Sequence, residues 1–141
     1  MITIGVSSWM PDLDSFFAEI SKLLAPDGMI FIYEHHSILI MREPGQANDP
    51  VSWELSYFRD DAYIDESGLD YYGGESYEAS PNVSFSHKMS DIVMGAINSS
   101  LTLDYFEELP KHTLNAWWNV EHSEIGLQMS YVMVFREPSH I

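Results

Sequence analysis

The hydrophobic residues of this chain change their spacing from one segment to the next. A short apolar run at residues 2–6 is typical of a strand buried on both faces. Residues 13–24 carry apolar side chains three and four positions apart, which predicts one face of a helix that begins after Pro11-Asp12. A Pro-Asp-Gly turn ends this helix, and residues 29–33 form a second apolar run. Strand, helix and strand in this order predict a right-handed βαβ unit at residues 1–35.

The regular spacing disappears between residues 36 and 86, although aromatic residues remain frequent there. Gly73-Gly74 and Pro81-Asn82 mark turns. The segment is too aromatic for a linker and too aperiodic for one long element. We therefore expect a packed cap with one or two short helices or a hairpin, and residues 54–58 are a candidate for a helical turn.

Residues 87–138 return to regular patterns. Ser90-Asp91 suits the start of a helix whose apolar face is formed by five residues: Ile92, Val93, Ala96, Ile97 and Leu101. Residues 103–109 and 127–135 alternate as strands do. In the second of these strands one face carries Met129, Tyr131, Met133 and Phe135. We expect residues 1–141 to form a single domain.

Composition and charge narrow the classes of function. The 141 residues have a core-forming composition, 45% hydrophobic and 13% aromatic, and contain no cysteine, which excludes disulfides, thiolate zinc sites and a cysteine nucleophile. Six Lys and Arg against 22 Asp and Glu give a formal charge of −16. Such acidity argues against nucleic acid or an anionic membrane as a partner. Since no apolar run approaches the roughly 20 residues of a membrane span, we expect a cytoplasmic protein.

Six stretches, in order, are similar to the motifs of one family. Residues 9–13 lead into a helix, residues 23–32 contain the Pro-Asp-Gly turn, and residues 33–36 read Tyr-Glu-His-His. Further matches are residues 85–92, 103–108 and 132–138. Together they resemble the C-terminal half of a class I methyltransferase that depends on S-adenosylmethionine (SAM). The likeness is to the small-molecule enzymes of the type 11 and type 12 groups.

The resemblance implies an α/β fold, a partial Rossmann-like methyltransferase domain. Its four-stranded, mostly parallel sheet would have the family's strand order 4-5-7-6, with the last strand antiparallel, and would carry helices and the aromatic cap. The family's Gly-rich SAM-binding loop is absent, since the only Gly-Gly pair lies within the cap. We therefore expect the chain to bind SAM weakly or not at all, and to be inactive, on its own.

The missing half would also leave the first strand as an exposed apolar edge and one face of the sheet uncovered. A homodimer or a separate N-terminal SAM-binding half would cover them. The expected function is the substrate-side portion of a small-molecule methyltransferase. The alternative is a non-catalytic oligomerising or ligand-binding module that uses the same half-fold.

The candidate site residues follow the first two strands, at the edge where α/β proteins bind ligands. By the resemblance, Ser7, Ser8 and Trp9 would lie beside the cofactor's methyl group; otherwise they form a turn. His35 or His36 is the candidate base, because the pKa of histidine lies near neutrality. Either could instead simply close the end of the strand.

Substrate contacts are expected from Glu34, from His87, and from three aromatic residues of the cap: Trp53, Tyr57 and Tyr72. Ordinary packing of the cap is the competing explanation for the aromatic residues. Adjacent residues of a strand point to opposite faces, so His35 and His36 are poor joint ligands and no metal site is predicted. No Gly-x-Ser-x-Gly elbow supports a serine hydrolase.

Overall fold

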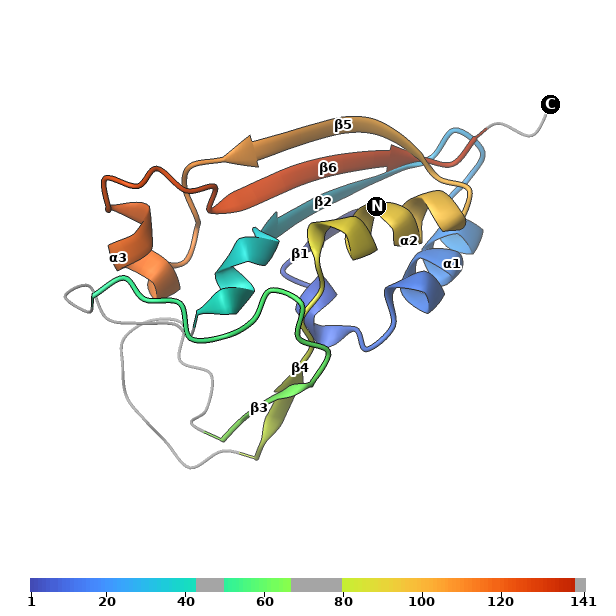
Figure 1. Ribbon diagram of the computed structural model, residues 1–141. Coiled ribbons are helices and arrows are strands. Elements are labelled where there is room, and N and C mark those ends of the chain that lie inside the picture. The colour runs from blue at the N-terminus through green and yellow to red at the C-terminus, as the bar shows by residue number, and fades with distance from the viewer. Residues whose placement is uncertain (43–49, 67–79, 139–141) are drawn as a thin grey trace.

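The computed structural model describes residues 1–42, 50–66 and 80–138. Its centre is a four-stranded sheet of order β1 (Ile2–Ile4), β2 (Met29–His35), β6 (Ser130–Arg136), β5 (Thr102–Leu109). β1 runs parallel to β2, whereas β6 is antiparallel to both of its neighbours. Figure 1 shows the sheet with α1 and α2 side by side on one of its faces. The strand order and the single reversed strand confirm the predicted architecture.

The first helix, α1 (Leu13–Leu23), connects β1 to β2 as the βαβ prediction requires. Asp12 caps it, since Oδ1 accepts hydrogen bonds from the backbone N–H groups of Asp14 and Ser15. Its buried face consists of Leu13, Phe17 and Ile20. Leu23, within the predicted stripe of residues 13–24, is 71% exposed, whereas Leu24 packs against the core.

The second helix, α2 (Met89–Asn98), packs beside α1 over the centre of the sheet. Ile92 and Ala96 are buried as predicted, but Ile97 is 46% exposed. The two helices approach closely at Gly95, where an added Cβ would lie 2.9 Å from the ring of Phe17. Under them lie the inward-facing residues of β6, all fully buried as the alternation predicts: Tyr131, Met133 and Phe135.

The cap contains a short 3-10 helix, η2 (Ser37–Met41), and a hairpin of β3 (Tyr63–Asp65) and β4 (Asn82–Ser84). The expected hairpin is confirmed, but residues 54–58 form turns rather than a helix. Each end of the cap is fastened. The buried Arg42 donates from Nη1 to the Ser52 carbonyl (2.9 Å), and the Phe85 N–H donates to the Ser8 carbonyl (2.8 Å).

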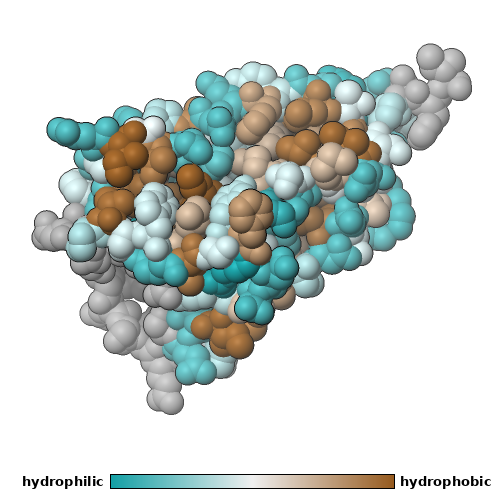
Figure 2. All heavy atoms as spheres, viewed as in Figure 1, coloured by the Kyte–Doolittle hydropathy of each residue, from teal (hydrophilic) through white to brown (hydrophobic). Residues whose placement is uncertain are grey.

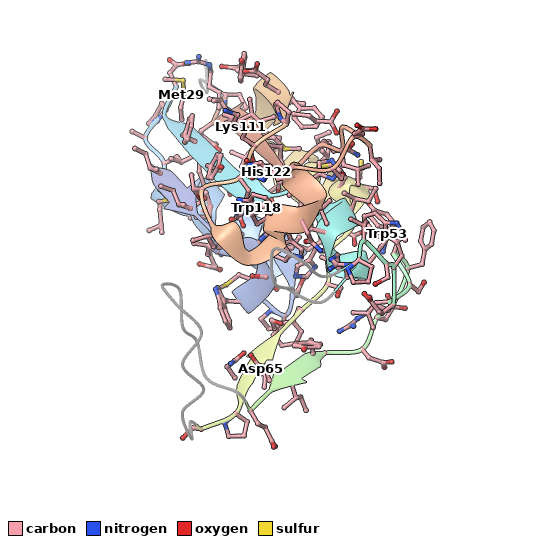
Figure 3. The ribbon with its side chains drawn as sticks, turned by 90° about the vertical axis from the view of Figure 1, so that its left-hand side faces the viewer. Met29, Trp53, Asp65, Lys111, Trp118 and His122 are labelled. Atoms are coloured by element: carbon pink, nitrogen blue, oxygen red, sulfur yellow. The ribbon has the colours of Figure 1, made fainter. Side chains whose placement is uncertain are left out.

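Two short helices, η3 (Asn115–Trp117) and α3 (Trp118–Glu121), close the end of the molecule opposite the α1–β2 turn. Trp118 stacks on His122 with 4.0 Å between ring centroids, and Figure 3 shows this pair on α3. Hydrophobic groups gather on the surface at this end (Figure 2). No helix within residues 1–42, 50–66 and 80–138 is long and apolar enough to cross a membrane.

No helix or strand among the described residues covers the face of the sheet opposite α1 and α2. We call it the open face and define it by eight side chains: Ile2, Ile4, Met29, Phe31, Tyr33, Tyr105, Val132 and Val134. Ile2 is 70% exposed and Ile4 65%, so the expectation that the first strand is buried on both faces was wrong. No other strand pairs with the outer edge of β1 among the described residues. The expected bare edge and bare face are thereby confirmed.

Candidate functional site

The carboxyl ends of β1 and β2 are tied together by one buried side chain. Glu34, the sixth residue of β2, is 1% exposed and points to the helix-covered side of the sheet. Its Oε1 accepts hydrogen bonds from the backbone N–H groups of Val6 (2.7 Å) and Ser7 (3.1 Å), at the start of the 3-10 turn η1 (Ser7–Trp9). The carboxylate therefore fixes the position of the turn that follows β1.

A small hollow lies directly above this junction. Its volume is about 220 Å³, counting space open to solvent, and eight residues line it: Ser7, Ser8, His35, Ser37, Ile40, Phe85, His87 and Ile92. Four of these were predicted as site residues from sequence. The hollow is polar along the β1 and β2 rim and apolar where Ile40, Phe85 and Ile92 line it. The structure thus brings together residues from the βαβ unit, both ends of the cap and α2.

Two buried polar groups lie side by side beneath the rim. Glu34 and Tyr131 are cross-strand partners on β2 and β6, and both are fully enclosed. Among the described residues, neither Glu34 Oε2 nor the Tyr131 hydroxyl has a hydrogen-bond partner. Burial raises the pKa of Glu34, although the backbone N–H groups of Val6 and Ser7 lower it in part, and burial together with the neighbouring Glu34 raises the pKa of Tyr131. The pair forms a buried acid and phenol directly below the serine of the turn.

His35 borders the hollow, but its ring packs among other aromatic rings. The ring centroid lies 5.4 Å from that of Trp117 and 6.2 Å from that of His112. Burial, followed by the neighbouring His112 and His36, lowers the pKa of His35 to about 4. The imidazole is therefore neutral at physiological pH and is a weak proton acceptor.

His36 is buried on the opposite side of the strand from His35. Its Nδ1 accepts the Ile38 N–H (3.1 Å), and its Nε2 lies 2.8 Å from a carboxylate oxygen of Glu108. Burial lowers the pKa of His36, while Glu108 acts in the opposite direction. Because both ring nitrogens are engaged, His36 holds η2 and β5 in place and presents no free nitrogen to the hollow.

His87 and Tyr57 connect the cap to the two helices. The Nε2 of His87 donates to the Met10 carbonyl (2.7 Å), and the residue lines the hollow. The Tyr57 hydroxyl accepts the Met89 N–H (3.0 Å) at the start of α2. Tyr57 therefore fastens the cap to α2 as a structural clamp. This agrees with the explanation that the aromatic residues of the cap serve in packing.

The remaining predicted residues lie elsewhere. Trp9 ends η1 and is 36% exposed, and it does not line the hollow. Trp53 is 40% exposed on the cap segment, where Figure 3 labels it. Tyr72 falls outside the described residues. The expected aromatic substrate pocket is thus not assembled by Trp53 and Tyr57, because the first faces outwards and the second is used to fasten the cap.

Sequence reasoning missed several residues that the fold brings to the hollow. Ser37 follows the two histidines directly, and Phe85 stands at the point where the cap returns to α2. Tyr131 was recognised only as part of an apolar face. Its polar neighbour Glu34 lies 97 positions earlier in the chain, and cross-strand pairing alone makes them adjacent. Only the strand assignment together with the sheet order would have revealed this pair.

Comparison with known proteins relates the fold to one class of structures. No protein-family model and no curated protein matches the sequence. Among solved structures, a protein from Listeria monocytogenes, provisionally described as a SAM-dependent methyltransferase, matches 96% of this chain with a TM-score of 0.67 and 7% identity. SAM-dependent methyltransferases from Mesorhizobium loti (TM-score 0.63, 16% identity, 96% of this chain) and Clostridium acetobutylicum (0.53, 9%, 98%) also match.

These likenesses define the class of fold. The chain has the α/β architecture of part of a SAM-dependent methyltransferase, and the low identities carry no statement about activity. The chain spans 58% to 59% of the length of the three structures.

The described residues do not fit a whole SAM molecule. Sites for ligands of this size enclose roughly 300–1,000 Å³, more than the hollow provides. The hollow is lined by serines, histidines and apolar groups, with no carboxylate and no glycine among its lining residues. The space that it encloses is about that of a single water molecule, so a bound acceptor group would also need room from the solvent side.

Proposed function

We propose that this chain is the substrate-facing portion of a SAM-dependent methyltransferase that acts on a small molecule. The observation that carries the proposal is the hollow at the carboxyl ends of β1 and β2, in a fold shared with such enzymes. Open α/β sheets bind ligands at these strand ends. Most of the cofactor would be held by residues beyond those that line the hollow, so the chain by itself binds SAM weakly.

The residues of the hollow would act on the acceptor mainly by position. The Ser7 and Ser8 hydroxyls and the His87 ring would offer hydrogen bonds to a polar acceptor group. Ile40 and Ile92 exclude water from the other side. With a pKa of about 4, His35 contributes little as a base. Holding the reactants in a fixed orientation is by itself a large source of rate acceleration.

Titration of the isotope-labelled chain with SAM, followed by NMR, tests the proposal. SAM should shift the backbone amides of Ser7, Ser8 and His87, with saturation only in the millimolar range. Filling the hollow by Ser8→Phe should abolish these shifts, whereas Ser56→Phe, at an exposed position of the cap, should preserve them.

Two results would contradict the proposal. Micromolar affinity would show that the chain holds the cofactor unaided. Shifts that avoid the hollow altogether would remove the assignment of this site.

A non-catalytic oligomerising module remains the second candidate, and one observation favours it. The open face presents apolar side chains on all four strands, as an association surface would. Such a module requires no ligand at the hollow. The same NMR titration distinguishes the two functions, because a pure oligomerisation module leaves the amides of Ser7, Ser8 and His87 unchanged at every SAM concentration.

A further inference from the structure

Two buried polar atoms below the hollow have no structural use among the described residues. Glu34 is 1% exposed and Tyr131 is fully buried, and the two are cross-strand partners on β2 and β6. One carboxylate oxygen, Oε1, holds the N–H groups of Val6 and Ser7. The other, Oε2, and the Tyr131 hydroxyl are without a hydrogen-bond partner in the described part of the chain. Such atoms are costly to bury and are typical of a functional role or of a bound water or ion.

Ser7 connects this buried pair with the hollow. Burial raises the pKa of Glu34, and the backbone N–H groups of Val6 and Ser7, followed by the Ser7 hydroxyl, lower it in part. Burial and Glu34 raise the pKa of Tyr131, and the same hydroxyl lowers it in part. Ser7 also lines the hollow. The Ser7 side chain therefore adjoins the buried pair on one side and the hollow on the other.

The charges around the hollow favour a positively charged hydrogen-bond donor. An ionised Glu34 only accepts hydrogen bonds, so the Ser7 hydroxyl can donate to it and present its own lone pairs to the hollow. With a pKa of about 4 the His35 ring is neutral, and His87 is hydrogen-bonded to the Met10 carbonyl. No lysine or arginine is among the lining residues. A chain with a formal charge of −16 also concentrates cations around itself.

The size of the hollow limits the group that can enter. The enclosed part holds about one water molecule, and the rest of the space is open to solvent. A protonated primary amine ends in a compact group of about this size with three N–H donors, and the remainder of the molecule can lie in the open part. A cation whose nitrogen carries four methyl groups is too wide and has no N–H group.

We propose that the hollow binds the protonated amino group of a small molecule. The Ser7 and Ser8 hydroxyls would accept its N–H groups, and Glu34, behind Ser7, would supply the opposite charge. Because Glu34 acts through Ser7, it is a positioning residue. As the class of methyl acceptor, a small amine rests on the proposed methyltransferase function, but the binding itself requires no SAM.

Titration of the isotope-labelled chain with methylammonium chloride, followed by NMR at constant ionic strength, tests this proposal. At about pH 8 alkylamines are still protonated, whereas histidine is ordinarily neutral. The backbone amides of Ser7 and Ser8 should shift and saturate in the millimolar range. The side-chain carboxyl carbon of Glu34 should shift along the same curve. Tetramethylammonium, which has the same charge but no N–H group, and formate, an anion, should leave these resonances unchanged.

Three variants separate the proposed role of Glu34 from a structural one. Glu34→Gln keeps an acceptor for the N–H groups of Val6 and Ser7 but removes the charge, and it should weaken methylammonium binding at least tenfold. Ser7→Ala retains those N–H groups and should weaken binding at least threefold. The matched control is Glu19→Gln, which removes one carboxylate from the exposed side of α1 and should leave binding unchanged.

Circular dichroism establishes that each variant is folded, and Ser7→Ala decides the question if Glu34→Gln is not. Unchanged amides in methylammonium would indicate a hollow that takes water only and would overturn the proposal. Equal shifts with tetramethylammonium would overturn it too, because they would show general attraction of cations to an acidic chain. Native affinity in folded Glu34→Gln would have the same consequence. SAM takes no part in this titration, so failure of SAM to bind contradicts the proposed function alone.

Discussion

Acidification should weaken the fold through His35, and the size of the effect follows from the surroundings of its ring. Burial lowers the pKa of His35 from 6.5 to about 4 in the folded chain. The unfolded chain therefore takes up a proton near pH 6.5, while the folded chain resists it until about pH 4. Stability from the neutral ring is complete above pH 6.5 and is lost as the pH falls through this window. At about 1.36 kcal/mol per pKa unit, the loss is at most about 3.4 kcal/mol.

Urea unfolding followed by tryptophan fluorescence, at neutral pH and near the lower end of that window, measures this loss. His35→Phe keeps an aromatic ring against Trp117 but cannot take up a proton. On acidification its stability should therefore fall by roughly 2–3 kcal/mol less than that of the native chain. His122→Gln, which replaces an exposed imidazole at the end of α3, is the matched control. Its loss of stability on acidification should equal that of the native chain. If His35→Phe and the native chain lose stability in parallel, the ring of His35 is not buried as described and the reasoning fails.

Substitutions at three further positions test other parts of the fold by the same unfolding measurement. Glu34→Ala leaves the N–H groups of Val6 and Ser7 without their acceptor and should cost about 2–3 kcal/mol, whereas Glu34→Gln keeps an acceptor. Burial raises the pKa of Glu34 in the folded chain, so ionisation of this carboxyl group costs stability as the pH rises through that pKa. Glu34→Gln cannot ionise and should therefore lose less stability than the native chain over the same rise in pH. Gly95→Ala should destabilise by about 1 kcal/mol despite its better helix propensity, because its Cβ meets the buried Phe17 ring; a more stable variant would show that the ring can yield. Asp12→Ala removes the cap of α1 and should cost about 1 kcal/mol, and Asp12→Asn should restore most of it.

Local spacing was sufficient to predict the elements whose two faces differ clearly. The stripe of α1 and the alternation of Tyr131, Met133 and Phe135 each predicted the buried face correctly, because those elements lie over a core. The same reasoning failed for Ile2 and Ile4. Apolar side chains on both faces predict burial on both faces, but burial depends on whether another layer is present, and the sequence of one strand contains no information about that.

The candidate site was predictable in its location but not in its chemistry. The ends of the first two strands could be found from the βαβ pattern, and Ser7, Ser8 and His35, which follow or end those strands, do line one hollow. The state of each group depends on contacts between distant segments. The engagement of His36 by Glu108 joins positions 72 residues apart, and the Tyr57 clamp joins positions 32 residues apart. No spacing rule reports such contacts.

The fastening of the cap at its two ends has a consequence for how this chain can diversify. Arg42 and Phe85 secure the segment where it leaves the sheet layer and where it returns. Insertions and deletions between these points that spare Tyr57, which clamps the start of α2, therefore leave the strand register and the helix packing unchanged. Natural variation, or a library of grafted loops, could reshape one wall of the hollow while the scaffold keeps its stability.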